Sequence, residues 1–278
     1  MRAYLTCMRV PLSFRHLVSL PIRRIAVPIQ AGPNRGRKWS IAASGQGIAA
    51  GHYEPERFDA FAALIQPTDV FWDVGANHGY ASLIAARTIT ATSGEVHAFE
   101  PAEYNRWYLR THLSWNAATH VHVQPFALAD YVGTSTFGGT GSSAGFSLGN
   151  GREEVQVSTV SQLVADGLRA PTFLKADIEG AEAQMLKGAA AFLANAAAAG
   201  TLPLILISVH SPALYRDCRE ILLAVGYHVH ASHRLDASTD HGATWDADPD
   251  LLAIPPGRDV SAALGMRWLT AGQPPQLG

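Results

Sequence analysis

The sequence predicts an α/β fold in which a mostly parallel sheet of seven strands is covered by helices on both faces. Short apolar runs of strand length alternate with helical segments along the chain, and this alternation is typical of parallel sheets buried on both sides. Hydrophobic residues make up 47% of the 278 residues and charged residues 16%. That is the composition of a globular chain that can bury a substantial core.

The expected elements follow one another in chain order. Residues 1–50, rich in Pro, Gly and Arg, are expected to form an N-terminal extension with a short helix or hairpin, ahead of a domain over 51–278. A helix over 54–64 carries apolar residues on one face. Strands are expected at 70–74, 95–100, 121–125, 173–177, 204–210, 227–231 and 251–254, and helices at 80–88, 103–116, 181–198 and 214–225.

An insertion at residues 131–160 interrupts this alternation. The stretch 133–151 holds seven Gly and is flanked by strand-like segments at 127–132 and 155–160. We expect an inserted hairpin whose tip is either a surface loop or a lid over the substrate.

Bulk charge and cysteine content argue against several classes of protein. The net charge of −2 calls for no nucleic-acid or anionic-membrane partner. The two cysteines, Cys7 and Cys218, form neither a disulfide framework nor a zinc site and suit a reducing cytoplasm, which is the expected location. No apolar run is long enough to span a bilayer, and arginines interrupt the first 30 residues. A peripheral N-terminus is therefore favoured over a targeting or membrane-surface segment, and a homodimer is left open.

Three features around the expected strand at 70–74 are typical of a cofactor site: a glycine-rich turn after it, an acidic residue at the end of the next strand, and an acidic residue near its own end. Asp73-Val-Gly75-Ala-Asn77-His-Gly79 opens a helix, and its glycines permit a tight turn and close approach of a ligand. Glu100 ends the next strand, where a carboxylate can accept both ribose hydroxyls of an adenosine cofactor such as NAD or S-adenosylmethionine. Asp73 favours a cofactor with positive charge and would repel a pyrophosphate.

A second group of polar residues ends two later strands. Asp177 is expected in the site, because ligands bind at the carboxyl ends of strands in such sheets. Glu179 is equally well explained by helix capping. His210 shares a strand face with Ser208 and is either a base with a near-neutral pKa or a hydrogen-bonded structural residue. The candidate catalytic residues are Asp177, Glu182 and His210, and a divalent metal bound by these three is conceivable but not favoured.

Four motifs, in their order and spacing, resemble the FkbM family of methyltransferases. They are Asp73-Val-Gly-Ala-Asn-His-Gly79, Ala98-Phe-Glu-Pro101, Phe126-Ala-Leu-Ala-Asp130 and Leu174-Lys-Ala-Asp-Ile-Glu-Gly-Ala-Glu182. The resemblance covers roughly residues 51–227. It implies a Rossmann-like class I methyltransferase fold, S-adenosylmethionine as cofactor and O-methylation of a hydroxyl on a sugar, glycolipid or secondary metabolite.

The same resemblance implies which residues hold the cofactor. They are Asp73, Gly75, Asn77, Gly79 and Ser82 around the methionine part, Glu100 at the ribose, Ala127 and Leu128 near the adenine, Tyr53 and Glu54 from the N-terminal side, and Ala76, Tyr80, Pro101 and Asp177 beside them. The chain departs from the family at one point, because Ser208 stands where the family commonly has the Glu of Glu-Val-His. That departure weakens any two-carboxylate metal site.

Two other interpretations remain. One is an NAD-dependent oxidoreductase, and the other is a non-catalytic binding protein on the same scaffold. A nucleic-acid methyltransferase is disfavoured, because no basic stripe is evident and Asp177-Ile-Glu-Gly180 stands where base-amino methylation would use a Pro-Pro-Tyr-type motif. The expected partner is therefore a small-molecule or glycan acceptor.

Overall fold

Seven strands form the central sheet of the computed structural model, which describes residues 22–43, 47–138, 147–149, 151–232 and 250–264. The strand order is β12-β13-β11-β10-β3-β4-β5. Their bounds are β3 Val70–Val74, β4 Glu95–Phe99, β5 Val121–Gln124, β10 Phe173–Ala176, β11 Leu204–Ser208, β12 His228–Ala231 and β13 Asp250–Ile254. Neighbours pair in parallel except at β13, which is antiparallel to both β11 and β12. The predicted mostly parallel seven-stranded sheet is thus confirmed.

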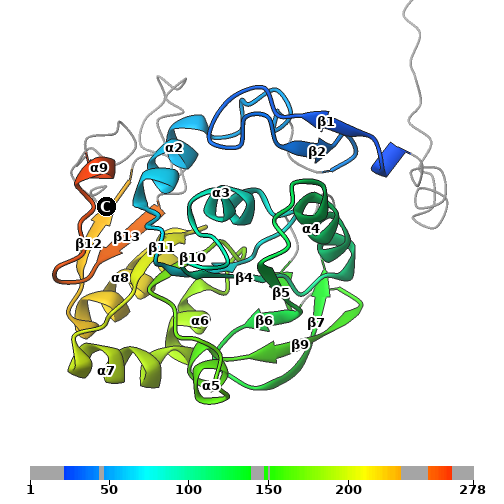
Figure 1. Ribbon diagram of the computed structural model, residues 1–278. Helices are drawn as coiled ribbons and strands as arrows, with labels where there is room; N and C mark the ends of the chain where they lie inside the picture. Colours follow the sequence, from blue (N-terminus) through cyan, green and yellow to red (C-terminus); the bar gives the residue numbers. More distant parts are fainter. Residues whose placement is uncertain (1–21, 44–46, 139–146, 150, 233–249, 265–278) are drawn as a thin grey trace, which may run out of the picture.

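Helices cover both faces of this sheet (Figure 1). On one face lie α2 Pro55–Leu64, α3 Tyr80–Thr88 and α4 Glu103–Trp115, and on the other α5 Val160–Ala165, α6 Glu182–Gly188, α7 Ala190–Ala199 and α8 Pro212–Val225. The short helix α9 Ser261–Leu264 packs beside α2. Among the described residues, no helix combines the length and hydrophobicity needed to cross a lipid bilayer.

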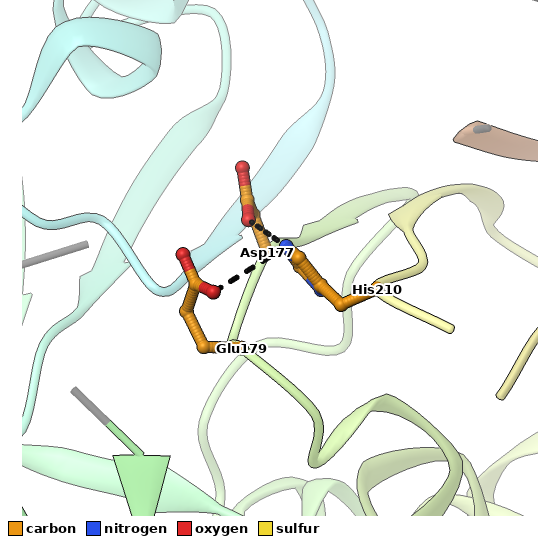
Figure 2. Close-up of side chains that lie close together, drawn as sticks. All are labelled: Asp177, Glu179 and His210. Carbon is orange, nitrogen blue, oxygen red and sulfur yellow. Dashed lines mark ion pairs between the residues drawn. The ribbon is translucent and has the colours of Figure 1, made fainter. Parts of the chain in front are cut away.

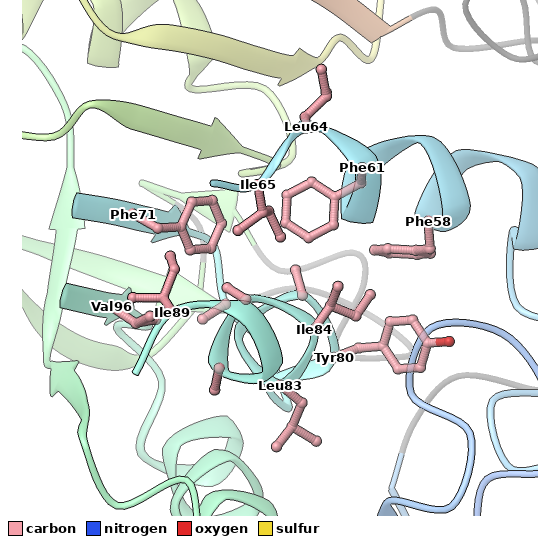
Figure 3. Packing of buried hydrophobic residues seen from close by; sticks show 14 of the residues in the cluster. Phe58, Phe61, Leu64, Ile65, Phe71, Tyr80, Leu83, Ile84, Ile89 and Val96 are labelled. Atoms are coloured by element: carbon pink, nitrogen blue, oxygen red, sulfur yellow. The ribbon is translucent and has the colours of Figure 1, made fainter. Parts of the chain in front are cut away.

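Aromatic packing fixes α2 against the sheet and α3 (Figure 3). The ring of Phe61 lies 5.6 Å from that of Phe71 and 5.7 Å from that of Phe173, between centroids. Phe58 meets Tyr80 of α3 edge-on at 4.7 Å. Because these contacts hold the helix in one orientation, its first turn brings Arg57 to the end of β10, within 3.3 Å of Asp177.

The N-terminal segment packs on the helices of the domain. Its strands β1 Ala26–Pro28 and β2 Lys38–Ser40 form an antiparallel hairpin. Trp39 stacks on His112 of α4 with ring centroids 3.8 Å apart. The backbone N–H of Ser40 donates to Nε2 of the same histidine at 3.0 Å. The described part of residues 1–50 therefore shares the core of the domain.

A second, smaller sheet contains the insertion at residues 131–160. Its strands are β6 Phe126–Leu128, β9 Glu153–Ser158, β7 Gly133–Gly138 and β8 Ser147–Leu148, in that spatial order. β7 pairs antiparallel with both β8 and β9, which makes a hairpin. Residues 139–146 and 150, which include most of the Gly-rich tip, lie outside the described residues, and so does its interpretation as a lid or loop.

The segment predicted as one helix over 181–198 is two helices, α6 and α7, so this prediction was wrong. The break follows Gly188, where an added Cβ would lie 1.9 Å from the carbonyl oxygen of Ala129. The prediction of one helix rested on the high helix propensity of the many alanines in this segment. Intrinsic propensity does not report a close approach between distant parts of the backbone. Helix α5 was also missed, because its first residue Val160 was assigned to a strand; Thr159 caps it by accepting from the N–H of Gln162 at 2.9 Å.

Candidate functional site

A cavity of about 400 Å³ lies at the carboxyl ends of β3, β4 and β10. This is the edge at which α/β sheets bind ligands. Ten of the predicted cofactor residues line it: Tyr53, Gly75, Ala76, Asn77, Tyr80, Glu100, Pro101, Ala127, Leu128 and Asp177. The structure thus gathers in one cavity residues from five separate segments of the chain.

The loop after β3 approaches β10 so closely that residue 75 has no room for a side chain. Gly75 has a φ of +77°, and an added Cβ would lie 2.0 Å from the carbonyl oxygen of Asp177. The N–H groups of Gly75 and Ala76 both donate to the carbonyl of Phe99, at 3.0 and 2.9 Å. Glycine is therefore required here both by the left-handed backbone and by the approach.

Glu100 presents a buried carboxylate beside this loop. It is 3% exposed; Oε2 accepts from the N–H of Asn77 at 2.8 Å, and Oε1 accepts from the N–H of Ala102 at 2.9 Å and from the amide of Asn105 at 3.1 Å. Burial raises the pKa of Glu100 to about 7, although these hydrogen bonds and Arg106 act in the opposite direction. A carboxylate has about four acceptor sites, so it can accept further donors from a ligand.

Asp73 lies behind the loop, outside the cavity lining. Its Oδ1 is 3.1 Å from Nζ of Lys175, and its Oδ2 accepts from Ser82 Oγ at 2.6 Å. The sequence had suggested Asp73 as the partner of a cationic cofactor, but the parallel register of β3 and β10 sets Lys175 directly beside it. Lys175 satisfies that charge and lines the cavity in its place.

Three other predicted cofactor residues also lie outside the cavity lining. Gly79 caps α3. A Cβ added to Gly79 would lie 2.6 Å from the side chain of Leu109. Ser82 is turned to Asp73. Glu54 pairs with Arg57 at 2.6 Å.

The catalytic candidates meet around His210, and Figure 2 shows the carboxylates of Asp177 and Glu179 beside its ring. Nδ1 of His210 lies 3.0 Å from Oε1 of Glu182, whereas Nε2 lies 3.5 Å from Oδ1 of Asp177 and 3.7 Å from Oε2 of Glu179. Glu182 is fully buried and also accepts from the N–H of Gly180, so it is fixed behind the ring. Nε2 therefore faces the two carboxylates that line the cavity.

The near-neutral pKa expected for His210 was wrong. Burial lowers this pKa, but Asp177 and Glu182 outweigh burial and raise it to about 10. Burial would in turn raise the pKa of Asp177, but His210, Lys175 and Arg57 hold it well below its ordinary value. At neutral pH the pair is therefore an imidazolium and a carboxylate.

The space between Asp177, Glu179 and His210 could instead hold a divalent cation. One ligand atom each from Asp177, Glu179 and His210 lies within 4.8 Å of the others. Carboxylate oxygens and an imidazole are suitable donors for several divalent metals. Sequence reasoning grouped Glu182 with Asp177 and His210 as possible metal ligands. Its carboxylate instead contacts Nδ1 of His210, on the side of the ring away from Asp177 and Glu179.

Sequence reasoning missed several residues at this site. Arg57 was detectable, because it shares the apolar helix face of Phe61 and Leu64 at i+4 and i+7. Asp250 gave no local signal, because its contacts depend on strand pairing. The cavity lining also includes Trp39 and Ile48 from the N-terminal segment and Phe137 and Leu148 from the inserted hairpin.

The strand order, with its single reversed strand, and the cavity at the ends of β3 and β4 define a Rossmann-like class I methyltransferase fold. The model of the methyltransferase FkbM domain matches residues 73–235 of this chain, more than half of its length. The chain belongs to the FkbM methyltransferase family. No curated protein sequence gives a significant match.

Similar solved structures share little sequence identity with this chain. A methyltransferase FkbM from Methylobacillus flagellatus aligns over 70% of this chain and 48% of its own, with 20% identity and a TM-score of 0.50. The chain thus spans about half the length of that protein. A precorrin-6y C5,15-methyltransferase from Geobacter metallireducens aligns over 77% of this chain and 93% of its own, with 16% identity and a TM-score of 0.47.

Proposed function

We propose that this protein transfers a methyl group from S-adenosylmethionine to a hydroxyl of a small-molecule or glycan acceptor: a sugar, a glycolipid or a secondary metabolite. The observation that carries the proposal is the cavity itself. Its lining includes the buried carboxylate of Glu100 and two carboxylates that face His210, Asp177 and Glu179. An adenosine and a cationic methyl donor need these two environments.

The residues of the cavity fit this cofactor. Asn77 lines the cavity, and its buried Oδ1 accepts no hydrogen bond within the described part of the chain, which leaves an acceptor for a ligand. Gly75 lets the loop backbone come close to a ligand. We expect Asn77, Gly75 and Ala76 to contact the methionine part, Glu100 the ribose, and Ala127 and Leu128 the adenine.

The cofactor, when bound, supplies an activated methyl group, so the protein has to align the acceptor and take its proton. We assign the proton to Nε2 of His210, in the minor fraction of molecules whose ring is neutral at neutral pH. Glu182 holds the ring by Nδ1, and Asp177 stabilises the imidazolium that the proton transfer produces. This proposal requires no metal.

Calorimetry with S-adenosylmethionine, S-adenosylhomocysteine and NAD tests the cofactor. We expect the first two to bind and NAD not to bind. Binding of NAD without either sulfur compound would instead identify the protein as an oxidoreductase.

Release of S-adenosylhomocysteine from a panel of hydroxylated acceptors tests the reaction, with and without chelator. We expect turnover with at least one sugar, glycolipid or secondary metabolite, and no loss on chelation. A cofactor-dependent signal that disappears with chelator would place a divalent cation at Asp177, Glu179 and His210. Cofactor binding with no turnover on any class would support a binding protein.

The affinity for S-adenosylmethionine should rise with pH and depend on Glu100. With a pKa of about 7, Glu100 is mostly protonated at about pH 6 and mostly ionised at about pH 8. The ionised form offers the ribose an acceptor site that the protonated form lacks, so affinity should increase over this interval. Glu100→Gln should bind about 10- to 100-fold more weakly at about pH 8, because hydrogen bonds to charged groups contribute about 1.5–3 kcal/mol.

The matched control is Glu103→Gln, an exposed carboxylate on the adjoining helix. It should keep both the affinity and its pH dependence. Wild-type binding by Glu100→Gln would remove Glu100 from the ribose site.

A further inference from the structure

A buried arginine connects strand β13 to the acidic cluster. Arg57 is 5% exposed. Its Nε lies 3.1 Å from Oδ2 of Asp250 and its Nη2 3.1 Å from Oδ1 of the same carboxylate, while Nη2 also lies 3.3 Å from Oδ2 of Asp177. Because a guanidinium is a rigid planar fork, a two-point contact with Asp250 fixes the direction in which it reaches Asp177.

Asp250 is itself held in place. It is 1% exposed and stands directly opposite Ser208 in the antiparallel pair of β11 and β13. Ser208 Oγ donates to Oδ1 of Asp250 at 2.7 Å and is also contacted by Nη2 of Arg57. The backbone N–H of Asp250 donates to Ser232 Oγ at 3.0 Å. Asp250 is thus held in place through both its backbone and its carboxylate.

We propose that Asp250 is a positioning residue of the methyl-transfer site, acting through Arg57 to hold Asp177 against His210. The two oxygens of Asp177 are divided between these neighbours, with Oδ2 toward Arg57 and Oδ1 toward His210. Neither Arg57 nor Asp250 lines the cavity, so the effect passes through Asp177. The catalytic meaning of this proposal rests on the function proposed above.

Loss of the Asp250 charge should strengthen the contact of Asp177 with Arg57 and weaken its contact with His210. A buried guanidinium that loses an anion is strongly destabilised, so Arg57 should turn more fully to Asp177 and Glu54. Asp177 would then move away from His210. Among the described residues, the carboxylates that face His210 are Asp177, Glu179 and Glu182, and weakening the contact of Asp177 favours the neutral ring.

The test compares Asp250→Asn with the exchange variant Ser208→Asp/Asp250→Ser. Directly opposed residues have Cβ atoms about 5 Å apart, so the exchange returns a carboxylate to Arg57 from the other strand. The readout is the ¹⁵N spectrum of the His210 ring in the full chain at about pH 8, which reports its charge, together with the melting temperature. In Asp250→Asn we expect the neutral fraction of His210 to rise about tenfold, one pKa unit; in the exchange variant we expect it to return to the wild-type value.

Asp69→Asn is the control for a merely structural effect. Asp69 is also 1% exposed and also holds an arginine, Arg258, at 2.7 and 2.8 Å. It should lower the melting temperature without changing the His210 spectrum.

An unchanged His210 spectrum in folded Asp250→Asn would overturn the proposal. So would a change that the exchange variant does not reverse. If Asp250→Asn does not fold, Arg57→Lys takes its place, because lysine keeps the buried charge but not the two-point contact with Asp250. An unchanged His210 spectrum in that variant would overturn the proposal. The His210 signal can be read whether or not S-adenosylmethionine binds, so failure of this proposal is distinguishable from failure of the proposed function.

Discussion

Gly75→Ala should lose about 3 kcal/mol of folding stability and about tenfold or more of the affinity for S-adenosylhomocysteine. A left-handed φ costs a non-glycine residue about 1–2 kcal/mol. The added Cβ would also lie 2.0 Å from the carbonyl oxygen of Asp177, and forcing atoms into a packed site costs about 1–3 kcal/mol. The loop after β3 must then move away from β10, which opens the cavity. Urea unfolding and calorimetry measure the two effects.

Gly200→Ala separates backbone strain from the steric clash. Gly200 has a similar φ of +68° at the end of α7, but nothing lies within 4 Å of its added Cβ. This variant should lose about 1 kcal/mol and keep its affinity. Equal stability and equal binding in the two variants would show that the close approach at Gly75 is not needed.

His210→Ala should bind S-adenosylmethionine like the wild type and lose about 10²- to 10⁴-fold in turnover, the usual contribution of a general base. The exposed strand residue His228 provides the control, and His228→Ala should be fully active. Normal turnover by His210→Ala would remove this histidine from the mechanism.

The pH profile of the wild type gives a second test of His210. The base must be neutral, and the pKa of His210 is about 10. Below that pH the neutral fraction falls about tenfold per unit, so kcat/KM should rise with pH and level off near pH 10. His210→Ala should lose this slope. A wild-type profile that is flat between about pH 7 and 9 would contradict the assignment.

Local sequence patterns were sufficient for most of the sheet. Strand 70–74 and helix 80–88 agree with β3 and α3 at every residue, because apolar runs and helical periodicity act over a few neighbouring positions. The loop from Gly75 to Asn77 and Glu100 were found for a similar reason. Each directly follows or ends a strand, and in a parallel sheet all such ends meet at one edge.

Contacts between distant segments were beyond those patterns. Asp73 was expected to face a cofactor, but the β3–β10 register gives it to Lys175. The break after Gly188 depends on the backbone of Ala129.

Ser208 marks where sequence and tertiary structure divide most clearly. The family resemblance implies a carboxylate at this position, and the sequence has the hydroxyl of Ser208 there instead. Only the pairing of β11 with β13 shows that Asp250 brings a carboxylate to the same place, 2.7 Å from Ser208 Oγ and against Arg57. Residues 42 positions apart meet there because of strand register, which is set by the packing of the whole sheet. The chain's own order of residues therefore determined the strands, the glycine loop and the acidic strand ends, while the electrostatic partners of each site residue were decided by the fold.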